Sequence, residues 1–414
     1  MSGDPAPPGL WARYRGLSLG TRILVWLVLG VLVGALFGER ASIAQPLGDL
    51  FIRLLLMAAI PLVFFNLIAG LTSLADVSIL GRLGLRTLGF YLVTTTLALS
   101  VGVLMASWLQ PGRGMQLSET VDKEFGAVPS VTKVILDLFP SNVFEAFTSA
   151  NVAQVVVFAI FLGVAALTLP AEPKARLQAF FTLGADLLRA LVEIVLKFAP
   201  LGVGALAAAT VGEYGGAIFG PLAKFILAVW SGHAVMVVVY LLLLTLFTGY
   251  LPWTWLKKTG PLYATTAATC SSLASLVVAM DVAQQRLGLP KRIYSFTLPL
   301  GAQLNKDGTA IMLTGVLLFT AQAAGVELSW SQLVTILVVG LILSEGSGGI
   351  PGGGLVIALI FVEAFQLPLE IAGIVAGIYR LIDMGGTTIN CMGDMAWTTI
   401  LSEAEERRQG VGEA

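Results

Sequence analysis

Apolar stretches free of Asp, Glu, Lys and Arg recur along the whole chain. A helix needs about 20 mostly apolar residues to cross the hydrocarbon core of a membrane. The stretches lie at 23–38, 54–75, 87–112, 151–171, 225–256, 259–280, 308–326, 328–344 and 346–362. This pattern predicts an all-α polytopic membrane protein.

One further predicted helix is amphipathic. The stretch 177–209 carries four charged residues about one helical turn apart, namely Asp186, Arg189, Glu193 and Lys197. One face of this helix is therefore polar, and we expect it to border protein or the membrane interface.

Two predicted membrane elements are interrupted. Residues 344–354 read Ser-Glu-Gly-Ser-Gly-Gly-Ile-Pro-Gly-Gly-Gly, and 260–285 carries six Ser and Thr residues near its middle. Glycine and proline break helices, and non-helical backbone at membrane depth must be satisfied by protein or water. We predict two re-entrant hairpins, one of them with its tip at 345–353. A flexible extramembrane loop is the alternative for the glycine run. Two broken elements in corresponding places indicate a transporter site built from inverted repeats.

Composition supports the membrane assignment. The chain is 57% hydrophobic and 12% charged, with a mean hydropathy of +0.88. Soluble domains are about 45–50% apolar and about 25% charged, so an ordinary soluble enzyme is excluded. The net charge is −1 without a basic block, so we expect no nucleic-acid partner. The two cysteines, Cys270 and Cys391, indicate neither a disulfide framework nor a metal cluster.

The short loops carry most of their Lys and Arg on the side of the N-terminus. The positive-inside rule then predicts a multi-pass protein of the inner membrane with cytoplasmic N- and C-termini. The first apolar segment lacks the small-residue cleavage site of a signal peptide.

Polar and ionisable residues interrupt one apolar segment between the two predicted hairpins. Asn305, Lys306 and Asp307 lie there, and such groups at membrane depth are costly unless they have partners. We expect Gly308 to let the helix unwind and to free backbone carbonyls. Carbonyl, carboxylate and amide oxygens suit a hard cation such as sodium. A structural kink is the alternative.

The last apolar segment carries a polar stripe. Asp383, Thr387, Asn390 and Asp394 follow one another at spacings of four, three and four, which places them on one helical face. Apolar neighbours flank the stripe, so we expect it to be buried.

Together these motifs resemble the dicarboxylate/amino acid:cation symporters. Ser295-Phe-Thr-Leu-Pro-Leu-Gly-Ala302 followed by Asn305-x-Asp-Gly-Thr309 resembles the seventh helix of that family, and 383–394 resembles its eighth. Thr269-Cys-Ser-Ser272 and 344–354 are similar to the tips of its two hairpins, and Tyr91-x-x-Thr94-Thr95 is similar to part of its third helix.

The resemblance implies eight transmembrane helices plus two re-entrant helical hairpins, assembled as a homotrimer. It also implies a transport domain that moves against a scaffold like an elevator. The scaffold would comprise 1–84 (helices 1–2) and 150–212 (helices 4–5). The transport domain would comprise 85–112 (helix 3), 213–256 (helix 6), 257–288 (hairpin 1), 289–326 (helix 7), 328–368 (hairpin 2) and 369–404 (helix 8).

The resemblance further implies roles for individual residues. One cation site would use Tyr91, Thr94, Thr95, Asn305 and Asp307, a second Gly301, Asn390 and Asp394, and a third carbonyls near Ser344 and Ser347. Asp383 would bind the amino group of the substrate. The carboxylate of the substrate would lie against Asn390 and the hairpin-tip amides. The implied substrate site comprises Ser271, Ser272, Thr309, Gly349, Asp383, Gly386, Thr387 and Asn390.

Three residues depart from the family pattern. Gly386 stands where acidic-substrate members carry an arginine, so no partner for a side-chain carboxylate is present there. Lys306 and Glu345 stand where many members are neutral or apolar. We predict that these two form an ion pair in which the ammonium replaces one bound cation. The alternative is that both face water.

We therefore predict a symporter for a small amino acid with a neutral side chain, coupled to sodium or a proton. No cofactor is expected, and membrane lipid surrounds the protein. The alternatives are a C4-dicarboxylate or acidic amino acid symporter, a channel-like member, or a hydrolase using Ser271 or Ser272. His233 is expected to be a packing residue, and Arg380 to pair with Asp383 or a lipid headgroup.

The sequence thus predicts a secondary active transporter and not an enzyme.

Overall fold

The structure is a computed structural model that describes residues 14, 16–17, 19–72, 77–115, 136, 139–148, 152–344, 346 and 352–412. Within these ranges all regular secondary structure is helical and no strand occurs. The first helices are α2 (Leu19–Phe37), η1 (Gly38–Ala44), α3 (Gln45–Thr72), α4 (Val77–Leu109), α6 (Val143–Thr148), α7 (Val152–Leu167), α8 (Ala171–Leu196) and α9 (Ala199–Tyr214). They are followed by η2 (Gly215–Ile218), α10 (Phe219–Thr248), α11 (Pro252–Thr269), α12 (Ser272–Asp281), η3 (Val282–Leu287), α13 (Lys291–Leu304), α14 (Asp307–Ala323), α15 (Trp330–Ser344), α16 (Gly353–Ala364) and α17 (Leu369–Gly412).

Several helices have the length and apolar composition of membrane spans. In the described part of the chain these are Thr21–Leu54, Leu83–Leu109 and Gly215–Thr248, with a fourth if the bent pair α8 and α9 counts as one span. Shorter apolar helices include α15 and α16, which follow each other along the chain. The all-helical, apolar character expected from the sequence is confirmed.

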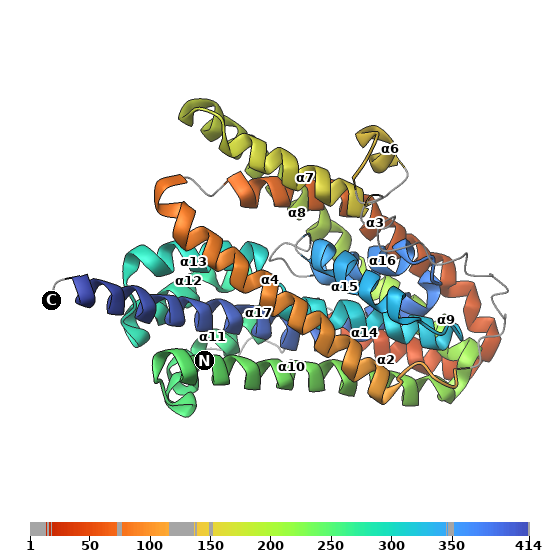
Figure 1. Ribbon diagram of the computed structural model, residues 1–414. Helices are drawn as coiled ribbons and strands as arrows, with labels where there is room; N and C mark the ends of the chain where they lie inside the picture. Colours follow the sequence, from red (N-terminus) through yellow and green to blue (C-terminus); the bar gives the residue numbers. More distant parts are fainter. Residues whose placement is uncertain are drawn as a thin grey trace, which may run out of the picture.

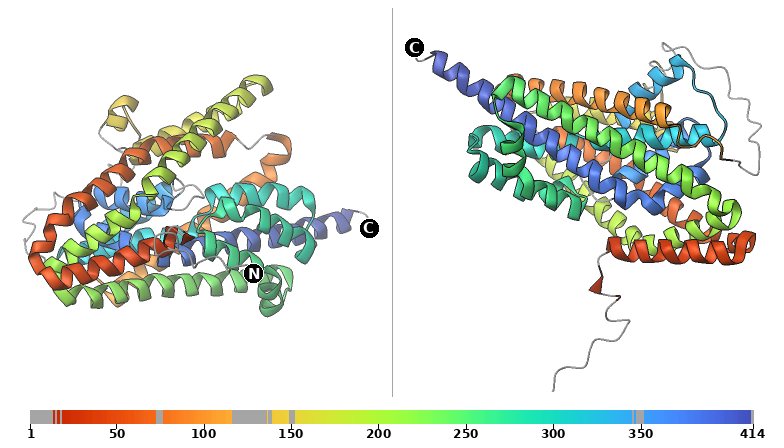
Figure 2. Two further views of the ribbon diagram at one scale, coloured as in Figure 1. Left: turned by 180° about the vertical axis from the view of Figure 1, so that it is seen from behind. Right: turned by 90° about the horizontal axis from the view of Figure 1, so that it is seen from below.

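The helices pack as two groups. In one group, α2, α3, α7, α8 and α9 pack chiefly on one another, and in the other α4 and α10 to α17 do so. Figure 1 and the right view of Figure 2 show α4, α10 and α17 as long helices that lie side by side. Fewer contacts join the groups, mainly between α17 and α9, α16 and α3, and α15 and α7.

The prediction of one continuous amphipathic helix over 177–209 is wrong. The chain bends by 51° between α8 and α9. Pro200 occupies the first turn of α9, where its missing N–H leaves no intrahelical bond unmade. The proline therefore begins a new helix instead of continuing the old one.

Helix α17 is tied to its neighbours by threonine pairs. The hydroxyls of Thr297 on α13 and Thr398 on α17 lie 2.7 Å apart. Those of Thr266 on α11 and Thr388 on α17 lie 2.9 Å apart. Hydrogen-bonded side chains at these crossings satisfy polar groups that would otherwise be buried without partners, and they fix the register of α17.

Candidate functional site

A break between α13 and α14 forms the centre of the polar region. Asn305 (φ −80°, ψ 115°) and Lys306 (φ −132°, ψ 34°) leave the helical conformation, and Asp307 begins α14. All three are buried, with 0%, 1% and 0% of their surface exposed. The prediction that Gly308 unwinds the helix is wrong, because Gly308 lies within the first turn of α14 and the break precedes Asp307.

The Asp307 carboxylate is held by two other helices. Thr95 of α4 donates a hydrogen bond to Oδ1 at 2.6 Å, and the Tyr240 hydroxyl of α10 donates one to Oδ2. Thr94 lies beside the same carboxylate. The structure thus brings the predicted residues Thr94, Thr95 and Asp307 together.

Tyr240 was missed by the sequence analysis. It lies in the middle of α10 among apolar residues, and its side chain is fully buried. The sequence offers one signal, an aromatic hydroxyl in an apolar helix, since a buried Tyr O–H usually has a hydrogen-bond partner.

A second cluster surrounds Asp394 on α17. The Asn305 Nδ2 amide donates to Asp394 Oδ1 at 2.9 Å and to the Asn390 carbonyl at 3.0 Å. A Cβ atom on Gly301 would overlap the Asp394 carboxylate and the Tyr91 hydroxyl, so these groups meet directly at the glycine. Asn305 Oδ1 is buried and accepts no hydrogen bond from the described residues. A carboxylate, a backbone carbonyl and an unpartnered amide oxygen are a donor set for a hard cation.

The Asn390 side chain joins α17 to the start of α14. Its Oδ1 accepts a hydrogen bond from the Gly308 N–H at 2.8 Å, and its Nδ2 donates to Thr309 Oγ1 at 3.3 Å. The Nε2 of His233 lies 3.3 Å from the Gly308 carbonyl, and His233 is buried against α14 and α17. The first turn of α14 is therefore held in place by His233 of α10 and Asn390 of α17.

Gly308 allows α14 and α17 to cross at this point. A Cβ atom on Gly308 would overlap the backbone of Gly386. We expect Gly308→Ala to destabilise the protein by about 1–3 kcal/mol, the usual cost of overpacking. Thermal unfolding of the purified protein in detergent measures this effect. The matched control is Gly89→Ala on α4, where a Cβ atom meets nothing within 4 Å. Equal melting temperatures for the two variants would contradict the close crossing.

Asp383 lies at the other end of the polar stripe, next to a small cavity. Thr387 donates to Asp383 Oδ1 at 3.1 Å. Oδ2 is buried, and although Tyr379 and the backbone of Gly352 lie near the carboxylate, no described residue makes a well-formed hydrogen bond to Oδ2. The cavity measures about 60 Å³ and is lined by α2, α3, α8 and α9 on one side and by α16 and α17 on the other.

The break between α11 and α12 lies close to this end of α17. Cys270 adopts the left-handed conformation (φ 51°), and Ser271 caps α12 by accepting a hydrogen bond from the Ala274 N–H at 3.1 Å. Ser272 lies against Cys391 of α17. Arg380 donates to the Ala268 carbonyl at 2.6 Å, so its guanidinium contacts the end of α11.

Most of the second predicted hairpin tip, including Glu345, Ser347 and Gly349, lies outside the described residues. Ser344 ends α15, and its hydroxyl donates to the Leu341 carbonyl at 3.0 Å. The pair of Lys306 with Glu345 stays a prediction.

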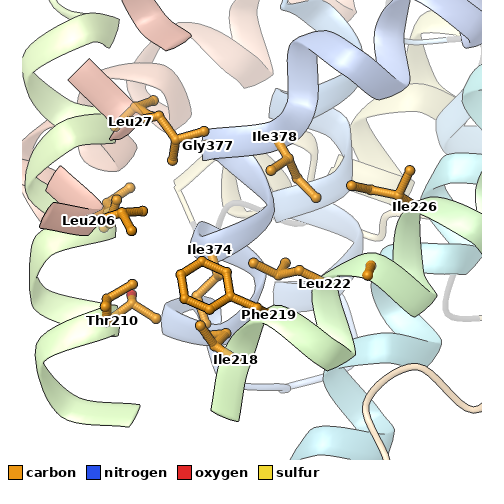
Figure 3. Close-up of a pocket in the computed structure, with 15 residues that line it drawn as sticks. Leu27, Leu206, Thr210, Ile218, Phe219, Leu222, Ile226, Ile374, Gly377 and Ile378 are labelled. Atoms are coloured by element: carbon orange, nitrogen blue, oxygen red, sulfur yellow. The ribbon is translucent and has the colours of Figure 1, made fainter. Parts of the chain in front are cut away.

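A larger cavity lies elsewhere and is apolar. It measures about 230 Å³ between α2, α9, α10 and α17, and its lining includes Leu206, Phe219, Leu222 and Ile374 (Figure 3). Thr210 is the single described lining residue of this cavity with a polar side chain. This cavity offers no partner to a charged substrate.

The apolar spans, the buried carboxylates and the oxygen clusters at a broken helix are typical of a membrane transporter for a small solute. The sequence profile of the sodium:dicarboxylate symporter family matches residues 19–404. The chain therefore belongs to this family, whose members are symporters and not enzymes.

Individual relatives cover nearly the whole chain. A proton/glutamate-aspartate symporter of Bacillus subtilis (strain 168) is 33% identical over 394 residues, which is 93% of this chain and 94% of the relative. A proton/glutamate-aspartate symporter of Escherichia coli (strain K12) is 28% identical, covering 94% of this chain and 93% of the relative. A C4-dicarboxylate transport protein of Bacillus subtilis (strain 168) is 28% identical, covering 94% of each.

Proposed function

We propose that the chain is a cation-coupled symporter for a small neutral amino acid. The observation that carries this proposal is the environment of Asp383. Asp383 lines a cavity and its buried Oδ2 oxygen lacks a well-formed hydrogen bond from the described residues, while Gly386, three residues on, has no side chain. A partly buried carboxylate with an oxygen that accepts no well-formed hydrogen bond suits a substrate ammonium. A second carboxylate on the substrate would have no cation at Gly386.

The coupling cations would bind at the two oxygen clusters. One cluster surrounds Asp307 with Thr95 and Tyr240, and the other surrounds Asp394 with Asn305 and Gly301. Relatives are described as proton and as proton/sodium symporters, which supports sodium or a proton as the coupling ion. Asn390 links the clusters to the stripe that leads to Asp383.

The two helix groups support a division into a scaffold and a transport domain. The Asp383 cavity lies between them, with α2, α3, α8 and α9 facing α16 and α17. In this proposal α11 with α12 and α15 with α16 are re-entrant hairpins, and movement of the second group against the first exposes the substrate on alternate sides. Eight spans, a homotrimer and cytoplasmic termini complete the arrangement.

An acidic amino acid or C4-dicarboxylate is the second candidate. The relatives named above are all described as transporters of glutamate and aspartate or of C4-dicarboxylates. In this chain Arg380 lies one turn before Asp383 and borders the same cavity, so its guanidinium could take the place of the absent arginine.

Ligand stabilisation distinguishes the two candidates, because a ligand that binds only the folded state raises the melting temperature. Neutral amino acids such as alanine and serine are expected to stabilise the purified protein, whereas aspartate, glutamate and succinate do not. Arg380→Gln should leave stabilisation by neutral amino acids unchanged, as should the exposed control Arg292→Gln. Stabilisation by aspartate alone, lost in Arg380→Gln but not in Arg292→Gln, would establish the acidic candidate instead.

A further inference from the structure

The Lys306 side chain is one of the largest that are fully buried in the described structure, with 1% of its surface exposed. It lies in the break between α13 and α14, at the centre of the polar region. A lysine ammonium is rarely buried unless oxygen atoms replace its hydration shell. The oxygen atoms around the Lys306 ammonium therefore show what kind of site it occupies.

Two of these oxygens are backbone carbonyls at the end of α13. Lys306 Nζ donates to the Ala302 carbonyl at 2.9 Å and to the Asn305 carbonyl at 3.3 Å. In an unbroken helix the Ala302 carbonyl would accept from the N–H of residue 306, so the break frees it. Carbonyls at a helix C-terminus also carry the negative end of the helix dipole.

Two carboxylates also contribute to the electrostatic environment of the ammonium. The Lys306 charge interacts with Asp307 and with Asp394, one from each oxygen cluster. Freed carbonyls and nearby carboxylates are the ligands that a sodium ion takes in proteins, and here a side chain of the protein itself supplies the positive charge.

We propose that the Lys306 ammonium is a built-in cation, which occupies the carbonyl subsite at the end of α13 and keeps a free cation from binding there. This inference rests on the proposed function as a cation-coupled symporter. The number of free cations in the transport cycle is then one lower than with an uncharged residue at position 306. The clusters at Asp307 and Asp394 remain open to the coupling ion.

The number of sodium ions bound per chain tests this proposal. Equilibrium binding of radioactive sodium to the purified protein, without substrate, is compared between the wild type, Lys306→Met, Lys306→Gln and Lys306→Arg. Met removes the charge and the donors, Gln keeps donors without charge, and Arg keeps the charge. The matched control is Lys258→Met, a lysine on α11 whose ammonium lies over the Tyr250 ring.

We expect one additional sodium ion per chain in Lys306→Met and in Lys306→Gln. Lys306→Arg and Lys258→Met should bind as many as the wild type. The same sodium stoichiometry in all folded variants would overturn the proposal, and either neutral variant suffices if the other does not fold. Because no substrate is added, this result is independent of whether neutral amino acids are the substrate.

Discussion

Asp383→Ala is expected to weaken substrate binding by about a hundredfold or more, which corresponds to about 2.7 kcal/mol. The carboxylate is the proposed partner of the substrate ammonium, and its buried Oδ2 has no well-formed hydrogen bond from the described residues. Truncating one partner of a buried charge pair leaves the other charge uncompensated, a loss of about 3–5 kcal/mol. Calorimetric titration of the purified protein with the substrate found by the stabilisation screen measures the change.

The variant should stay folded and keep its sodium stoichiometry, because Asp383 is not part of either cation cluster. Asp281→Ala is the matched control, since Asp281 is an exposed carboxylate at the end of α12. Near-normal affinity in Asp383→Ala would show that the ammonium site lies elsewhere.

Asp394→Asn is expected to abolish coupling while leaving Asp383 in place. Asp394 is 3% exposed and accepts a hydrogen bond from the Asn305 amide at 2.9 Å, beside Asn305 Oδ1, which accepts none from the described part of the chain. Asparagine has almost the same size but no charge, so it cannot compensate a bound cation in this buried cluster. We expect substrate affinity to lose its dependence on the coupling ion and gradient-driven uptake to fall by about a hundredfold or more, on the scale of a lost buried charge.

Substrate binding titrations at several sodium concentrations and pH values measure this loss. Glu406→Gln, an exposed carboxylate on the same helix, is the control and should behave as the wild type. An Asp394→Asn protein whose affinity still rises with the coupling ion would remove Asp394 from the cation site.

The polar stripe of α17 was predictable from the sequence because it depends only on the spacing of residues within one helix. The stripe needs one continuous helix and the spacings of Asp383, Thr387, Asn390 and Asp394, and α17 runs unbroken from Leu369 to Gly412. Thr387, Asn390 and Asp394 are buried as predicted, and Asp383 is partly buried.

Contacts between distant helices could not be predicted in the same way. Tyr240 lies 67 positions before Asp307, and nothing in its own segment indicates which carboxylate it meets. The break was expected at Gly308, two to three residues too late, because glycine suggests unwinding, whereas Gly308 allows the close crossing with Gly386. Tertiary packing decides what a glycine does at a given position.

The bend between α8 and α9 could not be predicted from the spacing of the charged residues either. The four charged residues between 177 and 209 keep helical spacing, so the pattern contains no sign of a bend. Pro200 was the available signal, and its position in the first turn of α9 marks the start of a helix.

The central claim, cation-coupled symport of a small neutral amino acid, is tested most directly by uptake into proteoliposomes. Labelled neutral and acidic amino acids and succinate are offered while sodium and pH gradients are imposed separately. We predict that a neutral amino acid accumulates against its own gradient only when one of these cation gradients is present, and that Asp394→Asn abolishes the accumulation. Uptake that merely equilibrates the substrate, whatever gradient is imposed, would contradict the account.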